Sequence, residues 1–358
     1  MKSLRLTAAL CLAIASPALA ESAKGPHLTV DNFQGSLKPI GFVMKEPGYH
    51  VWCNSPMIGP DGRCHLFVSR WPITAGFDAW HTRCEIARYE APAPEGPWTF
   101  KEVLLTGNKQ SGDGWPANSP HNPSVVKLKE GRYALTFIGN SGGNPGAFPA
   151  DQKIGMMLAD KPDGPWKLVG TDGLVLSPPA DPAIWCHDSA VGVNNPALLE
   201  SGGKFLLYYK AMRPGKGEVR RMSVAIADKV EGPYVFQPLP LTENKQGIED
   251  GYAFRMDGRI HLITTDSHTG GGWIWSSDDG LKFDPEPKRA YDNMRTMKTK
   301  EEIAAMKPIY GPCSFQRPQL LLDPTTGVPT YLFTASGTNP KDDAGSRPFV
   351  FKIVPPQE

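Results

Sequence analysis

The chain has 358 residues, a formal net charge of +1, 40% hydrophobic residues, 37 glycines and 36 prolines. This hydrophobic content excludes a disordered chain, and the many glycines and prolines favour short strands joined by turns. The near-neutral charge gives no electrostatic reason to expect nucleic acid or an anionic membrane as a partner. We therefore expect small neutral or mildly charged ligands, such as glycans.

Residues 1–20 have the pattern of a secretory signal peptide. Lys2 and Arg5 precede an apolar stretch from Leu6 to Ala15, and the small residues Ala18-Leu19-Ala20 follow. The stretch is too short for a membrane span, which needs about 20 apolar residues, and no later segment is long enough. We expect cleavage after Ala20, export to the periplasm or the medium, and a mature chain of 338 residues with a formal charge of −1.

The cysteines that remain after this cleavage are Cys53, Cys64, Cys84, Cys186 and Cys313. Because their number is odd, at least one thiol stays unpaired even in an oxidising compartment, and the sequence leaves the pairing open. None has the Cys-x-x-Cys spacing of a structural zinc site, so we expect no metal site of that kind.

A short motif recurs at a constant interval. Glu95-Gly96-Pro97-Trp98, Asp163-Gly164-Pro165-Trp166 and Glu231-Gly232-Pro233-Tyr234 place their glycines 68 residues apart, and Asp279-Gly280-Leu281-Lys282-Phe283 is a degenerate fourth copy. Each copy follows a run of small and apolar residues. We interpret each as the turn between the third and fourth strands of a repeated unit, with Trp98 and Trp166 packing as part of that unit.

Five hairpins supply the first two strands of the units. They are Ser55–Ile58 with Cys64–Arg70, Pro123–Leu128 with Tyr133–Gly139, Pro196–Leu199 with Phe205–Ala211, Tyr252–Met256 with Arg259–Thr265, and Pro318–Leu322 with Pro329–Ala335. Units of four antiparallel strands at this spacing predict an all-β, five-bladed β-propeller, because radial repetition lets each blade bury both faces against its neighbours.

The remaining segments fit this architecture. Thr299-Lys300-Glu301-Glu302 is a capping box, and it predicts a short helix from Glu301 to Lys307, inserted between blades four and five. Asn32 to Lys45 and Phe349–Val354 are left to complete the last blade and close the ring. The expected organisation is a single propeller domain over residues 21–358.

In a propeller, the start of each innermost strand and the loop after the second strand open into one funnel. The candidate site residues at these places are Trp52, Asn54, Asp78, His121, Asn122, His187, Asp188, Asn195, Glu249, Asp250, Asp266, His268 and Arg317. Sugars need hydrogen-bonding groups and aromatic faces, and glycoside hydrolysis needs two carboxyl groups in different protonation states. Backbone capping explains any single Asn or Asp at a strand start equally well, but recurrence in five blades favours a carbohydrate site.

Several motifs resemble those of the five-bladed propeller glycosidases of glycoside hydrolase family 43 and its relatives, including family 117. The motifs are Glu249-Asp250-Gly251, Gly258-Arg259-Ile260-His261-Leu262, Asp266 with Thr269-Gly270, and Ser276-Ser277-Asp278-Asp279-Gly280. The resemblance implies an exo-acting or side-chain-removing glycosidase that requires no cofactor, with a structural calcium on the axis in some relatives. It also implies three catalytic residues. These are an Asp in blade one as the general base, a second Asp that adjusts the pKa of the general acid, and a Glu as that acid, which is a His in family 117.

The chain departs from this pattern in blade one, where Asn54-Ser55-Pro56 replaces the base. An amide is no useful proton acceptor at neutral pH, so either the base lies elsewhere, with Asp188 favoured over Asp78, or hydrolysis proceeds differently. We hypothesise that Glu249 is the general acid, with its pKa raised by Asp250 and by burial, and that His121 is the second candidate for the acid. On this hypothesis a Glu249→Gln variant loses turnover and keeps its melting temperature.

The other candidates receive binding roles. Asp266 and His268 would hold Glu249 or the leaving group, and Arg317 would contact a hydroxyl or carboxylate of the substrate. Tryptophans such as Trp52 would stack on the sugar. The sugar, the linkage and the stereochemical outcome stay open.

Two other functions remain open at this stage. A non-catalytic glycan-binding propeller would keep the tryptophans and asparagines but would need no protonatable pair. A glycoside phosphorylase would need a cluster of basic residues for phosphate, which Lys210, Arg213, Arg220 and Arg221 could supply.

Overall fold

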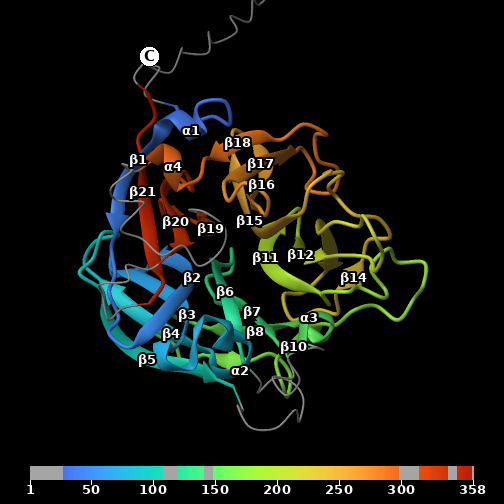
Figure 1. The fold of residues 1–358 in the computed structure, drawn as a ribbon, viewed down its shortest axis with the longest axis horizontal. Coiled ribbons are helices and arrows are strands. Elements are labelled where there is room, and N and C mark those ends of the chain that lie inside the picture. Colours follow the sequence, from blue (N-terminus) through green and yellow to red (C-terminus); the bar gives the residue numbers. More distant parts are fainter. Residues whose placement is uncertain (1–26, 108–118, 141–147, 298–313, 338–344, 357–358) are drawn as a thin grey trace, which may run out of the picture.

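The computed structural model describes residues 27–107, 119–140, 148–297, 314–337 and 345–356. In this part of the chain, five antiparallel sheets stand around a common centre (Figure 1). The predicted all-β, five-bladed propeller is therefore confirmed. The four described cysteines, Cys53, Cys64, Cys84 and Cys186, are buried and free.

The first three blades each begin with their innermost strand. Blade one contains β2 (Tyr49–Ile58), β3 (Cys64–Pro72), β4 (Glu85–Ala91) and β5 (Thr99–Thr106). Blade two contains β6 (His121–Lys127), β7 (Tyr133–Gly139) and β8 (Lys153–Ala159), with the short strands β9 (Lys167–Leu168) and β10 (Leu174–Leu176) paired to the same edge of β8. Blade three contains β11 (Asn194–Ser201), β12 (Lys204–Ala211), β13 (Arg221–Ala227) and β14 (Val235–Phe236).

The last blade joins the two ends of the described chain. Blade four contains β15 (Ile248–Met256), β16 (Arg259–Asp266), β17 (Gly272–Ser277) and β18 (Lys288–Tyr291). Blade five contains β19 (Gln316–Leu322), β20 (Pro329–Ser336) and β21 (Arg347–Ile353), and β1 (Leu37–Phe42) adds its outermost strand. β1 runs antiparallel to β21 with Leu37 opposite Ile353, so the predicted ring closure is confirmed.

The recurring Gly-Pro motif lies where the repeat predicted, between the third and fourth strands of blades one, two and three. Its glycine has a φ of 85–96° in all three copies, a conformation that residues with a side chain rarely adopt. Trp98 packs edge-on against Phe333 of blade five, and Trp166 packs against Phe67 of blade one. The motif therefore bends the chain and also holds each of these two blades against the preceding one.

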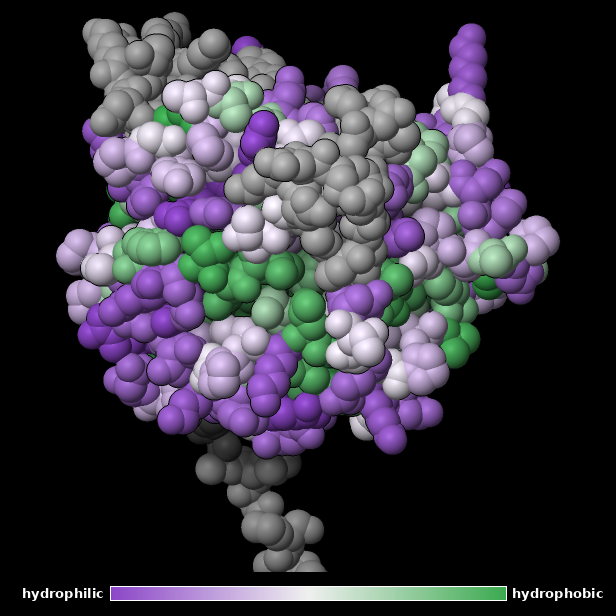
Figure 2. All heavy atoms as spheres, turned by 90° about the horizontal axis from the view of Figure 1, so that it is seen from below, coloured by the Kyte–Doolittle hydropathy of each residue, from purple (hydrophilic) through white to green (hydrophobic). Residues whose placement is uncertain are grey.

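The described helices have at most four residues each. They are α1 (Phe33–Ser36), η1 (Ile73–Ala75), η2 (Phe77–Ala79), α2 (Trp80–Arg83), α3 (Phe148–Asp151) and α4 (Met294–Met297). The helix predicted from Glu301 to Lys307 falls outside the described residues. None of the described helices is long and apolar enough to cross a membrane. Figure 2 shows the molecule from its edge, where hydrophilic side chains predominate and apolar ones gather near the middle.

Candidate active site

The five innermost strands share an irregularity near their starts. The pairing with the second strand shifts there in every blade, and the strand begins two to six residues before the predicted start. One residue at each shift has a positive φ, namely Cys53, Asn122, Asn195, Asp250 and Arg317, with values of 52–66°. Residues other than glycine rarely adopt this backbone conformation, and residues that do so cluster at functional sites. The predicted strands started too late because polar residues at the bulges interrupt the apolar pattern.

The side chains of these five residues meet at the centre of the propeller, and we call them the axial ring. Asn195 Nδ2 donates to Asp250 Oδ1 at 2.9 Å, and Arg317 forms an ion pair with the same carboxylate. Asn122 accepts from Arg317 Nη1 at 2.6 Å and Nη2 at 2.9 Å, while its amide also contacts the Cys53 thiol. Because the ring draws one residue from each blade, it ties all five together at the axis.

A cavity of about 650 Å³ lies over the axial ring, within the usual range for small-molecule sites. Blade one supplies an aromatic wall made of Trp52, Trp71, Phe77 and Trp80. The polar part of the lining includes His121, Lys210, Arg220, Glu249, Ser267, His268 and Arg317. An aromatic wall facing hydrogen-bonding groups is suited to a sugar ring, which has both apolar faces and hydroxyl edges.

Among the described residues, Glu249 is the one carboxylate that lines this cavity. It accepts from Lys210 Nζ at 2.9 Å, Ser267 Oγ at 3.0 Å and Arg220 Nη1 at 3.3 Å. Burial alone would raise its pKa, but the positive charges of Lys210, Arg220 and Arg317 outweigh burial and lower it well below 4.5. The expected upward shift is therefore wrong, and Glu249 is ionised at neutral pH.

In the two neighbouring groups, Asp250 and Lys210, the pKa shift favours the neutral form. Burial raises the pKa of Asp250 despite the adjacent Arg317, and the charge of Glu249 adds to this effect. Burial also lowers the pKa of Lys210, which Glu249 only partly offsets. Asp250 lies in the axial ring below the cavity lining, so its carboxylate supports Arg317 there.

His121 lies at the start of β6 with its ring 4.8 Å from that of Trp80. Its Nδ1 is 2.8 Å from the Ser119 carbonyl oxygen, so the proton of the neutral ring resides on Nδ1 and Nε2 carries the lone pair. Burial lowers the pKa of His121 to about 3. In the free protein the imidazole is therefore neutral at pH 7.

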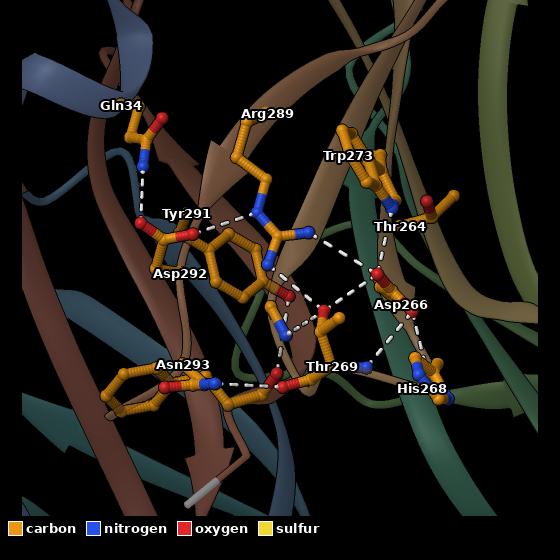
Figure 3. A network of polar contacts seen from close by, with 12 residues as sticks. Gln34, Thr264, Asp266, His268, Thr269, Trp273, Arg289, Tyr291, Asp292 and Asn293 are labelled. Atoms are coloured by element: carbon orange, nitrogen blue, oxygen red, sulfur yellow. Dashed lines mark hydrogen bonds and ion pairs between the residues drawn. The ribbon is translucent and has the colours of Figure 1, made fainter. Parts of the chain in front are cut away.

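Asp266 stabilises the loop between β16 and β17, as Figure 3 shows. Its carboxylate accepts from the backbone N of His268 at 2.9 Å, from Thr269 Oγ1 at 2.7 Å and from Trp273 Nε1 at 3.2 Å. Arg289 pairs with it at 3.4 Å. Asp266 thereby positions His268 at the cavity, while Ser267, which the sequence analysis did not single out, contacts Glu249.

The other sequence candidates divide into three groups. Trp52, Asn122, His268 and Arg317 line the cavity. Asn54 and Asn195 are buried below it, where Asn54 Nδ2 donates to the Thr334 carbonyl at 3.2 Å and Asn195 belongs to the axial ring. Asp78, His187 and Asp188 are exposed and outside the lining.

Asp188 is therefore not placed where the proposed base has to lie. The loop before β11 buries Trp185 and Cys186 and turns the next two side chains outward, with His187 Nδ1 3.5 Å from the Asp188 carboxylate. The sequence motif could not reveal this direction, because it depends on how the loop packs.

Within the described residues, no group of three or more His, Cys, Asp and Glu side chains could hold a metal ion. The guanidinium of Arg317 and its Asp250 partner meet at the centre of the axial ring. Calcium needs a shell of oxygen ligands, and a fixed positive charge repels it, so these residues do not fit an axial calcium.

The fold and its axial cavity define a five-bladed propeller with a funnel site, an architecture found in glycoside hydrolases. Zg3597, a family 117 glycoside hydrolase of the marine bacterium Zobellia galactanivorans, matches with a TM-score of 0.61 and 18% identity over 88% of this chain and 90% of that one. An alpha-L-arabinofuranosidase from Lactobacillus brevis matches with a TM-score of 0.54 and 12% identity over 85% and 91%.

A protein of unknown function from Dyadobacter fermentans is also similar, with a TM-score of 0.61 and 11% identity over 89% of this chain and 99% of that one. No family model and no curated protein matches the sequence. At these identities the similarity shows the fold, and the resemblance to families 43 and 117 is confirmed at that level.

Proposed function

We propose that the protein is an exported glycoside hydrolase that removes a sugar from the end of an oligo- or polysaccharide. The observation that carries this proposal is that His121, Glu249 and an aromatic wall line one cavity over the axial ring. A cavity with a floor admits the end of a chain more readily than its middle, which supports exo action. The signal-peptide pattern of residues 1–20 supports export.

The protonation states suggest the roles. Glu249 is ionised, which is the protonation state that a base activating water requires, although Lys210 and Arg220 also lower its basicity. The assignment of Glu249 as the acid is withdrawn. His121 is our proton donor, because its Nε2 becomes a donor once the ring is protonated. A hydrogen bond from Nε2 to the glycosidic oxygen favours the protonated ring, so we expect bound substrate to raise the pKa of His121.

The pH dependence tests the role of His121. If it is the donor, kcat/KM, which reports the free enzyme, should fall as pH rises above about 3. The value of kcat reports the enzyme–substrate complex, in which we expect the pKa of His121 to be raised. The decline in kcat should therefore lie at higher pH than the decline in kcat/KM. A rate that is instead lost as pH falls towards 3, while the chain remains folded, would show that neutral His121 is required, and the donor assignment would be wrong.

Hydrolysis itself is tested with chromogenic pentosides and hexosides, with and without phosphate. Glu249→Gln and His121→Asn should each lose turnover by about 100-fold or more, whereas Glu231→Gln, a surface control, should keep it. Phosphate-dependent release would indicate the phosphorylase alternative. Lys210 and Arg220 favour it, but Arg213 donates to the Trp185 carbonyl, and neither Arg213 nor Arg221 lines the cavity. Sugar binding without release would indicate a non-catalytic propeller.

A further inference from the structure

The charges that line the cavity are unbalanced. Lys210, Arg220, Arg295 and Arg317 face it, whereas Glu249 is the one described carboxylate in its lining. Asp250 below adds a second negative charge through its pair with Arg317. Among the described residues, four cations against two carboxylates leave an excess of two positive charges at the cavity, although the whole chain carries only +1.

The two carboxylates are already engaged by the deeper cations. Glu249 is shared between Lys210 Nζ at 2.9 Å and Arg220 Nη1 at 3.3 Å, and Asp250 pairs with Arg317. The pKa of the buried Lys210 is lowered by burial, and the charges of Arg220 and Arg317 lower it further. The deep part of the cavity therefore has no spare negative charge.

Arg220 and Arg295 hold the accessible part of this excess. The Arg220 side chain is 41% exposed and reaches Glu249 through Nη1 alone. Arg295 is exposed on α4 at the cavity, and none of the described carboxylates forms an ion pair with it. Guanidinium groups of this kind bind carboxylate and sulfate oxygens through paired hydrogen bonds.

We propose that the sugar bound in the cavity carries a carboxylate or sulfate group, which pairs with Arg220 and Arg295 while the tryptophans of blade one hold the ring. The sugar part rests on the proposed glycoside hydrolase function. The inference that the ligand carries a negative charge rests only on the excess of cations at the cavity. With a neutral sugar, Arg295 would have no counter-charge among the described residues, and Arg220 would have only its single contact with Glu249.

Calorimetric titration of the full mature chain tests the proposal. The probes are three pairs: glucuronate and glucose, galacturonate and galactose, and galactose 6-sulfate and galactose, with inorganic sulfate as a separate arm. At low salt, at least one charged sugar should bind about tenfold more tightly than its neutral counterpart. This preference should shrink in 0.5 M NaCl, because salt screens the ion pairs.

Variants locate the effect. Arg220→Gln and Arg295→Gln should each reduce the ratio of the affinity for the charged sugar to that for its neutral counterpart. Arg295→Lys should retain part of this ratio, because it keeps the positive charge. Arg132→Gln is the control on the turn between β6 and β7 and should leave the ratio unchanged. Melting temperatures show whether each variant is folded. The salt dependence of the unmodified chain requires no variant at all.

The outcomes separate this inference from the proposed function. Equal affinities within all three pairs, no binding of any charged sugar, or sulfate alone binding as tightly as the sulfated sugar would overturn it. Preference for a charged sugar without cleavage of its nitrophenyl glycoside supports the inference and contradicts hydrolysis. Cleavage of neutral glycosides without any charge preference supports hydrolysis and contradicts the inference.

Discussion

Replacing Glu249 by Gln should destabilise the fold as well as stop turnover. The Lys210–Glu249 pair has an N to O distance of 2.9 Å, with side chains that are only 8% and 14% exposed. Removing one partner of a buried pair leaves the other charge without compensation, which costs about 3–5 kcal/mol. The sequence alone suggested an unchanged melting temperature, because it did not show that Lys210 depends on Glu249.

A surface pair provides a matched control. Arg132 and Glu231 are also 2.9 Å apart, but their side chains are 35% and 41% exposed. Glu231→Gln should therefore cost at most about 1 kcal/mol. The two pairs have the same distance, but Arg132 is partly exposed and also pairs with Glu130, whereas Lys210 is buried and depends on Glu249. The comparison therefore contrasts a buried cation that loses its partner with a partly exposed cation that keeps one.

The assay is urea denaturation of both variants and the unmodified chain at several pH values. Folding lowers the pKa of Glu249 from its ordinary 4.5, so its stabilising contribution is full above that pH and is lost as pH falls through the folded pKa. The loss in Glu249→Gln should therefore be constant from about pH 5 to 7 and should shrink below about pH 4.5. A loss no larger than that of Glu231→Gln, or one that does not change with pH, would refute this reasoning.

Two further predictions concern the ring and the aromatic wall. Asp250 has a φ of 66°, which Asn tolerates better than Ala. In urea denaturation, Asp250→Ala should therefore have a free energy of unfolding about 1 kcal/mol lower than that of Asp250→Asn. Equal stabilities of the two variants would contradict a role for the backbone conformation. Trp80→Leu should raise KM for the cleaved glycoside roughly threefold to tenfold. Trp98→Leu, outside the cavity, should leave KM unchanged, and equal KM values in both variants would exclude Trp80 as a sugar platform.

The predictable part of the fold was encoded in local patterns. The Gly-Pro motifs repeat at 68 residues because blades one, two and three each need the same bend before the fourth strand. The hairpins were recognisable from the two-residue alternation of side chains along a strand. The starts of the innermost strands were misjudged at the bulges, where Asp250 and Gly251 separate two paired stretches of β15. A bulge breaks the two-residue period on which the prediction depended.

The candidate site was predictable as a set of strand ends but not as a chemical environment. Glu249 and His121, which the sequence offered as catalytic candidates, line the cavity, yet the predicted direction of the pKa shift of Glu249 was wrong. That direction depends on Lys210 and Arg220, which lie 39 and 29 residues away in the chain. Arg295 gave no signal in the sequence, because nothing there shows that α4 borders the cavity.

The sequence by itself determined the number of blades and their turns, because each depends on residues that are close together or repeat at a fixed interval. The closure of the ring by β1 and β21 was predictable only because these segments were left over at the two ends of the repeat. Only the tertiary structure decided which charges face one another. Electrostatic interactions act through space, so a glutamate held between a lysine and an arginine of the neighbouring blade is ionised whatever its own neighbours in the chain suggest.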